Sequence, residues 1–339
     1  MKKTSLFILL FILISCNDRK ETSTIEKDVI PYNYRNYSNF QKKKYLDSIF
    51  NKLIFLNDDS LKIKSLFEIC NQYYYHKDYI SSIKTSKKAF DTASKLNDSL
   101  NIGRSLYYIG DCYLEYQKDS AYYYYKEAEK IFRKLNNKEK LALVLYNKAY
   151  LLFYEGNYVE SEIEVIKALN CLKSSEKIIT KYRCYSLQGS NHLELGEYDK
   201  AEEYFNLSAD ILKQMKREGK VKDAYYDYEI TNTIDLCTAY DKKGEYKKSI
   251  SALNEIVTKS NFEAYPKLKY FVYGNLAYSL MKDHQYALSN KYFKQALSLA
   301  KKENDELGYL YIIVDFGEYH LATKDTLKAR ELFNEATTF

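Results

Sequence analysis

A repeat of about 40 residues runs through most of the chain and constrains its fold more than any other feature. Each copy contains a small residue, a usually larger one four positions later, and a second small one three positions after that. The first members of successive copies are 39, 40, 40, 48, 40 and 40 residues apart. These spacings place each triplet on one helical face, where small side chains let neighbouring helices approach closely. The triplets are Ser82, Ser86, Ala89; Ala121, Tyr125, Ala128; Ser161, Val165, Ala168; Ala201, Phe205, Ser208; Ser249, Leu253, Ile256; Ser289, Phe293, Ala296; and Ala329, Phe333, Ala336.

The connections between the predicted helices are short. Each triplet follows a turn such as Gly196-Glu197-Tyr198, and before each turn lies another amphipathic helix, so the repeat unit is a helical hairpin. The 339 residues include only 10 Gly and 2 Pro, too few for the many turns of a β-sandwich or barrel. The sequence therefore predicts an all-α chain whose hairpins stack to bury one continuous core.

The repeated residues resemble the tetratricopeptide repeat, whose signature is W-x2-L-G-x2-Y followed by A-x3-F. Matching stretches include Ile109-Gly110-x-x-Tyr113 and Leu236-Cys237-x-x-Tyr240. The resemblance implies a right-handed superhelical solenoid of about seven hairpins over residues 61–339, preceded by a half-repeat at 39–57. The chain departs from the family in having a period near 40 instead of 34, no Trp and no closing Pro.

Two local features refine this prediction. The 48-residue step adds residues around 213–222, where we expect two extended helices joined by a basic, solvated loop; contact with a lipid headgroup or an acidic partner is the alternative. Asparagine tolerates the left-handed conformation that ends a helix. It recurs at one repeat position and therefore predicts helix ends at Asn57, Asn97, Asn136 and Asn304.

Residues 1–15 have the pattern of a lipoprotein signal peptide. Lys2 and Lys3 precede an apolar run, Leu6 to Ile14, that as a helix reaches only roughly 13 Å, against roughly 30 Å of bilayer hydrocarbon. A basic start followed by a short apolar core is typical of a secretory signal. Leu13-Ile14-Ser15-Cys16 resembles the lipobox of bacterial lipoproteins, which implies that Cys16 is lipidated. An ordinary cleaved signal with an incidental Cys16 is the alternative.

Residues 16–38 are polar, mixed in charge and predicted to be a tether. Some 20 residues of flexible coil give a typical reach of about 25 Å. We therefore expect the protein in the bacterial cell envelope, lipid-anchored to a membrane, with the repeats standing off its surface. This combination resembles tetratricopeptide lipoproteins and sensor regions of the Bacteroidota type.

The sequence does not indicate catalytic or metal chemistry. No H-E-x-x-H, P-loop or G-x-S-x-G motif occurs, and the four histidines are far apart. A formal net charge of +6 is too small to indicate nucleic-acid binding. We expect no enzyme activity, no cofactor and no metal site. The cysteines besides Cys16 form no C-x-x-C pair, and two of them occupy small inward repeat positions; they are Cys70, Cys112, Cys171, Cys184 and Cys237.

In tetratricopeptide arrays the first helices line a concave groove that holds peptides or protein segments. The resemblance therefore implies a partner-binding groove, and four of its residues form an aromatic patch of candidate anchors, Tyr107, Tyr146, Tyr150 and Phe153. Packing of these rings beneath neighbouring helices is the alternative. The groove residues predicted by repeat position are Asn71, Tyr107, Asp111, Tyr146, Tyr150, Phe153 and Tyr278.

Two functions fit these features. The first is a membrane-anchored envelope lipoprotein that serves as a scaffold or adaptor and binds a protein or peptide in the groove. The second is the sensor part of a transcriptional regulator or histidine kinase whose C-terminal module is missing here. The lipidated start favours the first, and an end at Phe339, inside the last triplet, favours the second.

Overall fold

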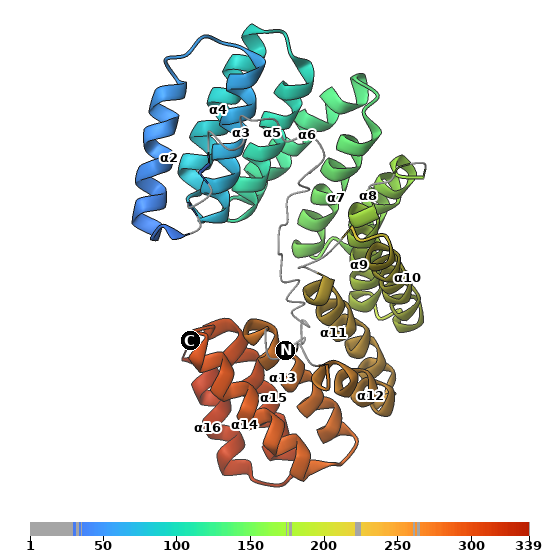
Figure 1. Ribbon diagram of the computed structural model, residues 1–339. Helices are drawn as coiled ribbons and strands as arrows, with labels where there is room; N and C mark the ends of the chain where they lie inside the picture. Colours follow the sequence, from blue (N-terminus) through green and yellow to red (C-terminus); the bar gives the residue numbers. More distant parts are fainter. Residues whose placement is uncertain are drawn as a thin grey trace. The chain divides into compact units, whose positions relative to one another are not determined.

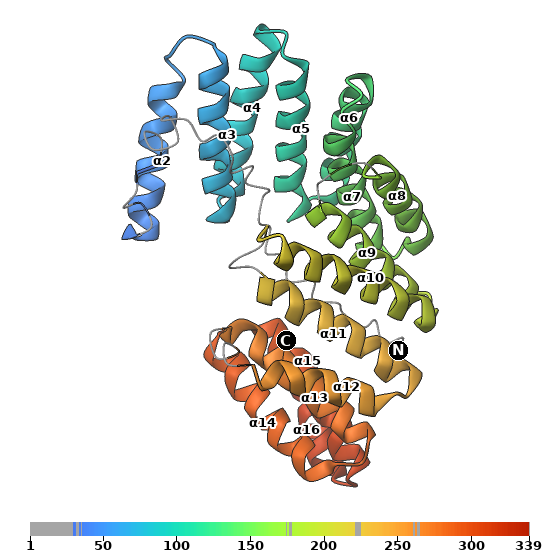
Figure 2. The same cartoon turned by 45° about the vertical axis from the view of Figure 1, so that its right-hand side comes forward.

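The computed structural model describes residues 30–338 except 32, 33, 35, 174, 176, 177, 221–224, 260, 261, 263 and 264. Within these residues the chain forms fifteen α-helices and no strand (Figures 1 and 2), which confirms the all-α prediction. The helices are α2 (Asn39–Leu53), α3 (Ser60–Tyr75), α4 (Tyr79–Lys95), α5 (Ser99–Leu114), α6 (Lys118–Lys134), α7 (Lys138–Tyr154), α8 (Tyr158–Cys171), α9 (Ile178–Glu194), α10 (Tyr198–Arg217), α11 (Tyr225–Lys243), α12 (Tyr246–Val257), α13 (Pro266–Lys282), α14 (Tyr286–Lys302), α15 (Glu306–Ala322) and α16 (Thr326–Thr337).

The helices divide between two compact units. The N-terminal unit ends at Thr180 and contains α2 to α8, and the C-terminal unit begins at Lys181 and contains most of α9 and all of α10 to α16. In both units an odd-numbered helix pairs with the even-numbered helix that follows it, from α3 with α4 to α15 with α16. Helices α9 and α10 meet where Gly189 faces the ring of Phe205. We refer to the two members of a pair as its first and second helix. The repeat thus folds as seven helical hairpins, and α2 packs on α3 before them.

Small residues on the first helices receive large residues from the triplets on the second helices. A Cβ on Gly110 of α5 would lie 2.7 Å from the ring of Tyr125 on α6, and a Cβ on Gly189 of α9 would lie 2.5 Å from the ring of Phe205 on α10. Tyr125 and Phe205 have no exposed surface. The triplets recognised in the sequence therefore form the contact between the two helices of a hairpin, where any larger residue would collide.

Most of the predicted helix ends are found. Asn97, Asn136 and Asn304 follow α4, α6 and α14 with φ of 54°, 50° and 53°, the left-handed conformation. The prediction is wrong at Asn57, which does not have a positive φ. Helix α2 has already ended at Leu53, so Asn57 lies in a longer connection that leads to α3. The 48-residue step is explained by α10 and α11, which are 20 and 19 residues long, as predicted.

The predicted signal peptide, residues 1–15, and Cys16 lie outside the described residues, as does most of the predicted tether. The end of that tether is packed, however. Tyr34 is only 4% exposed, its ring lies against Tyr37 and Tyr45, and its hydroxyl is 3.1 Å from Nε2 of His76 at the end of α3. The folded body therefore begins before α2, because aromatic side chains at the end of the polar segment cover the first hairpin.

Candidate functional site

The predicted partner-binding residues lie on the first helices of the hairpins. In the N-terminal unit α3 contacts α5, and in the C-terminal unit α11 contacts α13, which in turn contacts α15. First helices of successive hairpins are therefore neighbours within each unit. We refer to the surface along which they meet as the inner face of that unit.

A hydrogen-bonded network closes the inner face of the N-terminal unit. Oδ1 of Asp111 on α5 accepts hydrogen bonds from the Tyr125 hydroxyl and from Nδ2 of Asn147 on α7, both at 2.7 Å. Nδ2 of Asn147 also lies 3.2 Å from the Tyr107 hydroxyl. Burial, followed by the negative charge of Asp111, raises the pKa of Tyr125 well above its usual value. Tyr107 and Asp111, both predicted binding residues, thus join α5, α6 and α7.

The other predicted aromatic anchors are mostly buried. Tyr146, Tyr150 and Phe153 on α7 are 1%, 9% and 7% exposed, and the ring centroids of Tyr146 and Tyr150 are 6.4 Å apart. These three rings pack under neighbouring helices and do not stand out as exposed anchors. The reason is that α7 has buried residues on almost every side, so its pattern does not distinguish a groove from a core. Whether this face binds a partner stays a prediction.

The two remaining predicted residues lie far apart in the sequence. Asn71, on α3 in the N-terminal unit, is half-buried beside the hydroxyl of Tyr108. Tyr278, on α13 in the C-terminal unit, is also half-buried, and Nζ of Lys282 lies 5.0 Å from its ring centroid. The structure therefore brings six of the seven predicted groove residues into the N-terminal unit and leaves Tyr278 in the other.

A buried acid occupies the inner face of the C-terminal unit. Asp235 on α11 is 2% exposed, and its Oδ2 has no hydrogen-bond partner. Loss of hydration raises the pKa of this carboxyl to about 8. At neutral pH Asp235 is therefore mostly protonated and can donate a hydrogen bond as well as accept one.

A second carboxyl, that of Asp241, lies six residues further along α11. Oδ2 of Asp241 accepts a hydrogen bond of 2.8 Å from the Ser279 hydroxyl on α13, and the side chain of Ser249 on α12 also hydrogen-bonds to this carboxyl. Desolvation raises the pKa of Asp241 to about 7, and the charge of Asp315 on α15 adds to the effect. Desolvation, Asp315 and Asp241 also raise the pKa of Tyr278. Three first helices thus contribute to one acidic cluster around Tyr278, which we refer to as the acidic inner-face cluster.

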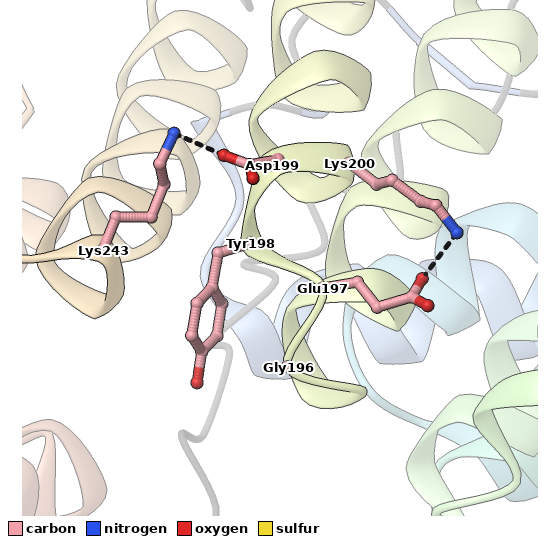
Figure 3. A pocket seen from close by; sticks show the side chains of 6 residues that line it. All are labelled: Gly196, Glu197, Tyr198, Asp199, Lys200 and Lys243. Atoms are coloured by element: carbon pink, nitrogen blue, oxygen red, sulfur yellow. Dashed lines mark hydrogen bonds and ion pairs between the residues drawn. The ribbon is translucent and has the colours of Figure 1, made fainter.

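A pocket of about 460 Å³ opens beside the turn between α9 and α10 (Figure 3). Its charged side chains are paired: Nζ of Lys243 lies 2.8 Å from Asp199, and Nζ of Lys200 lies 3.0 Å from Glu197. Lys243 also pairs with Glu202, at 2.6 Å. Since these carboxylates already surround the lysines, the pocket is a weak candidate for binding an anion. It is lined by Gly196, Glu197, Tyr198, Asp199, Lys200 and Lys243.

Metal ligands do not gather in the part of the chain that the structure describes, where no group of three or more His, Cys, Asp or Glu side chains could hold an ion. Four of the five cysteines there are buried thiols and Cys171 is half-buried. Over the same residues, no helix is both long and apolar enough to cross a bilayer.

Sequence reasoning missed Asn147, Asp235 and Asp241, because a single polar residue in an amphipathic helix is usually exposed. A signal was nevertheless present in the repeat register. Asn147, Asp235, Asn275 and Asp315 share one repeat position, 14 residues before the first small residue of their triplets. A position that is polar in four repeats, although it is Leu187 in α9, indicates a buried polar role when its neighbours are apolar.

No known family model matches the chain. It is similar to response regulator aspartate phosphatase A of Bacillus subtilis (strain 168), with 22% identity over 189 residues. That match includes 56% of this chain and 48% of the relative, so the chain spans about half the length of the curated protein it matches.

Solved structures share the fold. The apo form of the quorum sensor NprR from B. thuringiensis has a TM-score of 0.64 at 14% identity, over 91% of this chain and 84% of that one. A Rap protein complexed with Competence and Sporulation Factor has a TM-score of 0.60 at 15% identity, over 95% and 88%. A tetratricopeptide repeat protein from Parabacteroides merdae ATCC 43184 has a TM-score of 0.54 at 15% identity, over 86% and 100%. The fold is thus a helical solenoid of the tetratricopeptide type.

Proposed function

We propose that the protein is a scaffold or adaptor of the bacterial cell envelope that binds a protein or peptide segment on the inner face of its first helices. The observation that carries this proposal is the acidic inner-face cluster, in which the carboxyls of Asp241 and Asp315 lie around the half-buried ring of Tyr278. An aromatic ring beside carboxyl groups can pack against a bound segment while the carboxyls accept hydrogen bonds from it.

The likeness to a Rap protein complexed with Competence and Sporulation Factor supports this proposal, since a fold of the same kind there binds another molecule. Tyr278 is the predicted binding residue best suited to reach such a segment, because its ring is half-buried beside Asp241 and Asp315. The site needs no cofactor, and we propose no catalytic activity.

The test compares the acidic inner-face cluster with the outer side of the molecule. Tyr278→Ala with Asp241→Asn should weaken capture of a defined envelope partner by roughly 30-fold, as expected for the loss of one aromatic anchor and one charged contact. Lys87→Ser with Lys130→Ser, on exposed faces of α4 and α6, is the matched control. If the control loses the partner and the inner-face variant keeps it, the inner face is not the site.

The membrane anchor is the second part of the proposal, and it rests on Leu13-Ile14-Ser15-Cys16. Each buried methylene of an acyl chain contributes about 0.8 kcal/mol, so a multiply acylated Cys16 would hold the protein stably on a membrane. Cys16→Ala should abolish incorporation of labelled fatty acid and leave an uncleaved precursor or a soluble protein. Absence of label in the unaltered protein would contradict the anchor.

The sensor part of a larger regulator is a second candidate, favoured by the likeness to the quorum sensor NprR. In that case the acidic inner-face cluster would bind a signal, and a transcriptional or kinase module would follow Phe339. Sequencing the gene past the codon for Phe339 distinguishes the candidates. An in-frame DNA-binding or kinase module supports the sensor, and a stop codon at that point supports the scaffold.

A further inference from the structure

The outer faces of the second helices provide an internal standard, because seven versions of the same surface can be compared. Three repeat positions lie two residues before, two after and five after the first small residue of each triplet. Side chains at these positions are exposed in all seven second helices that the structure describes. At the third position six helices carry only lysine or asparagine, namely Lys87, Lys126, Asn206, Asn254, Lys294 and Asn334.

Helix α8 differs from this standard. Its three residues are Val159, Ile163 and Ile166, which are 53%, 47% and 44% exposed. None of the other six helices has more than one apolar residue at these positions. Spacings of four and three put the three side chains on one stripe. The other repeats carry mostly charged or amide side chains at these positions. The repeat fold therefore does not require an aliphatic stripe there.

The preceding hairpin carries an exposed aromatic residue at an equivalent place. Tyr123 on α6 occupies the repeat position of Ile163 and is 58% exposed. We refer to Tyr123, Val159, Ile163 and Ile166 as the α8 patch. The three aliphatic side chains share one stripe of α8, and exposed apolar residues grouped in this way mark interaction sites more often than scattered single residues do.

The charges beside the patch indicate which partner it fits. Between Lys148 and Lys167 the chain has four glutamates and no basic residue. Both lysines pair with Glu164, at 3.3 and 2.8 Å, whereas Glu155 and Glu160 are exposed. Lys126 is exposed on α6 and Lys167 is 48% exposed later in α8, so the acidic edge is formed by Glu155 and Glu160 at the start of α8. A partner with basic residues at that edge would meet complementary charge.

We propose that the α8 patch docks an amphipathic helix of a partner protein, with aliphatic residues against Val159, Ile163 and Ile166 and lysine or arginine beside Glu155 and Glu160. Ridges of one helix pack into the grooves of another at separations of roughly 8–10 Å, and the stripe has the spacing that this packing requires. An anionic bilayer is disfavoured as occupant, because the exposed glutamates would be repelled by its surface. This site is separate from the proposed inner-face site and does not depend on it.

The test uses the full chain and a fluorescent 18-residue helical peptide made of leucine on one side and lysine on the other. The key variant combines Val159→Asp, Ile163→Glu and Ile166→Asn, which copies onto α8 the residues that α10 carries at the same positions, Asp199, Glu203 and Asn206. We expect the variant to bind the peptide roughly 30-fold more weakly by fluorescence anisotropy, since three half-exposed aliphatic contacts are lost. Its two added negative charges would strengthen a purely electrostatic interaction instead.

Two controls accompany the key variant. Ile80→Ser removes an isolated aliphatic residue, 80% exposed on α4, and should leave binding unchanged. A peptide with glutamate in place of lysine should bind the unaltered protein at least about 10-fold more weakly. Should the key variant prove poorly folded by circular dichroism, Ile166→Asn alone, the residue found in α10, α12 and α16, should still weaken binding by about 3-fold.

Four results would overturn the proposal. The key variant could bind the lysine peptide as the unaltered protein does, or both peptides could bind equally. In sedimentation velocity, a dimer of the unaltered protein that dissociates in the key variant would identify a second copy as the occupant. Flotation with vesicles of phosphatidylglycerol, retained by the unaltered protein and lost by the key variant, would identify a bilayer.

Discussion

The two units place different chemistry at the same position of the repeat. In the N-terminal unit Asn147 bonds to Asp111 and lies within hydrogen-bond distance of two tyrosine hydroxyls. In the C-terminal unit the equivalent residue is Asp235, and its Oδ2 has no partner. The neighbours explain the difference, because Ser190 and Phe205 stand where Asp111 and Tyr125 stand in the N-terminal unit. Phe205 has no hydroxyl, so this repeat keeps the polar side chain of Asp235 but lacks the hydrogen-bonding group that Tyr125 supplies in the N-terminal unit.

The largest expected effect tests whether the inner face of the N-terminal unit is a core. Tyr146→Ala with Tyr150→Ala removes two buried, adjacent rings and should lower the free energy of unfolding by roughly 5 kcal/mol or more. Urea denaturation followed by circular dichroism measures this. Tyr123→Ala, on an exposed ring, is the control and should change stability by less than about 0.5 kcal/mol. Equal stability of the double variant and the control would mean that Tyr146 and Tyr150 are not part of the core and can serve as binding anchors.

The next largest effect is a dependence of the free energy of unfolding on pH, which we expect from the buried acids of the C-terminal unit. The pKa of Asp235 is about 8 in the folded protein, against about 3.9 for an unfolded chain. The folded state therefore holds the proton more tightly, so the stabilising effect is complete below about pH 4 and is lost as the pH rises to about 8. Asp241, with a folded pKa of about 7, acts in the same direction. We expect Asp235 alone to account for a loss on the order of 5 kcal/mol across this range.

Asp235→Asn isolates that contribution, since an amide does not titrate. Urea denaturation of the variant between pH 4 and pH 8 should show a shallower decline of stability than the unaltered protein shows. Tyr123→Ala, on an exposed ring, serves as a control that should leave the profile unchanged. A variant profile parallel to that of the unaltered protein would mean that Asp235 ionises normally.

The smallest expected effect comes from replacing Asn147 and Asp235, one at a time, with leucine. The molecule already has a leucine at this repeat position in α9, Leu187, which is 1% exposed. Asn147→Leu should destabilise by about 2 kcal/mol, because it leaves Asp111 and Tyr125 buried with one partner fewer. Asp235→Leu should be neutral or stabilise by about 1 kcal/mol at pH 7, because it removes a buried acid without a partner. Thermal melts of both variants report the sign. Destabilisation by both would mean that Asp235 has a partner of equal value to those of Asn147.

The predictions made from the sequence succeeded where one helix or one hairpin decides the outcome. The triplets gave the hairpin contact correctly because packing of Gly110 on Tyr125 needs only the two sequences that meet there. The error at Asn57 has a different origin. Its repeat position was right, but α2 ends at Leu53, earlier than the register implies. Asn57 therefore does not follow a helix directly and does not adopt the left-handed conformation. For Tyr150 the sequence left exposure and burial open, and the structure shows burial, with the rings of Tyr146 and Tyr154 from the same helix beside it.

The sequence by itself determined the all-α class, the hairpin period and the contact within each hairpin, because these follow from the spacing of small and large side chains along a helix. Only the tertiary structure decided what happens between hairpins. There it paired Asp111 with Asn147, left Oδ2 of Asp235 without a partner, and exposed the stripe on α8. The physical reason is that hydrogen bonding, hydration and exposure depend on which neighbours surround a side chain, and residues about 40 positions apart in the sequence supply those neighbours.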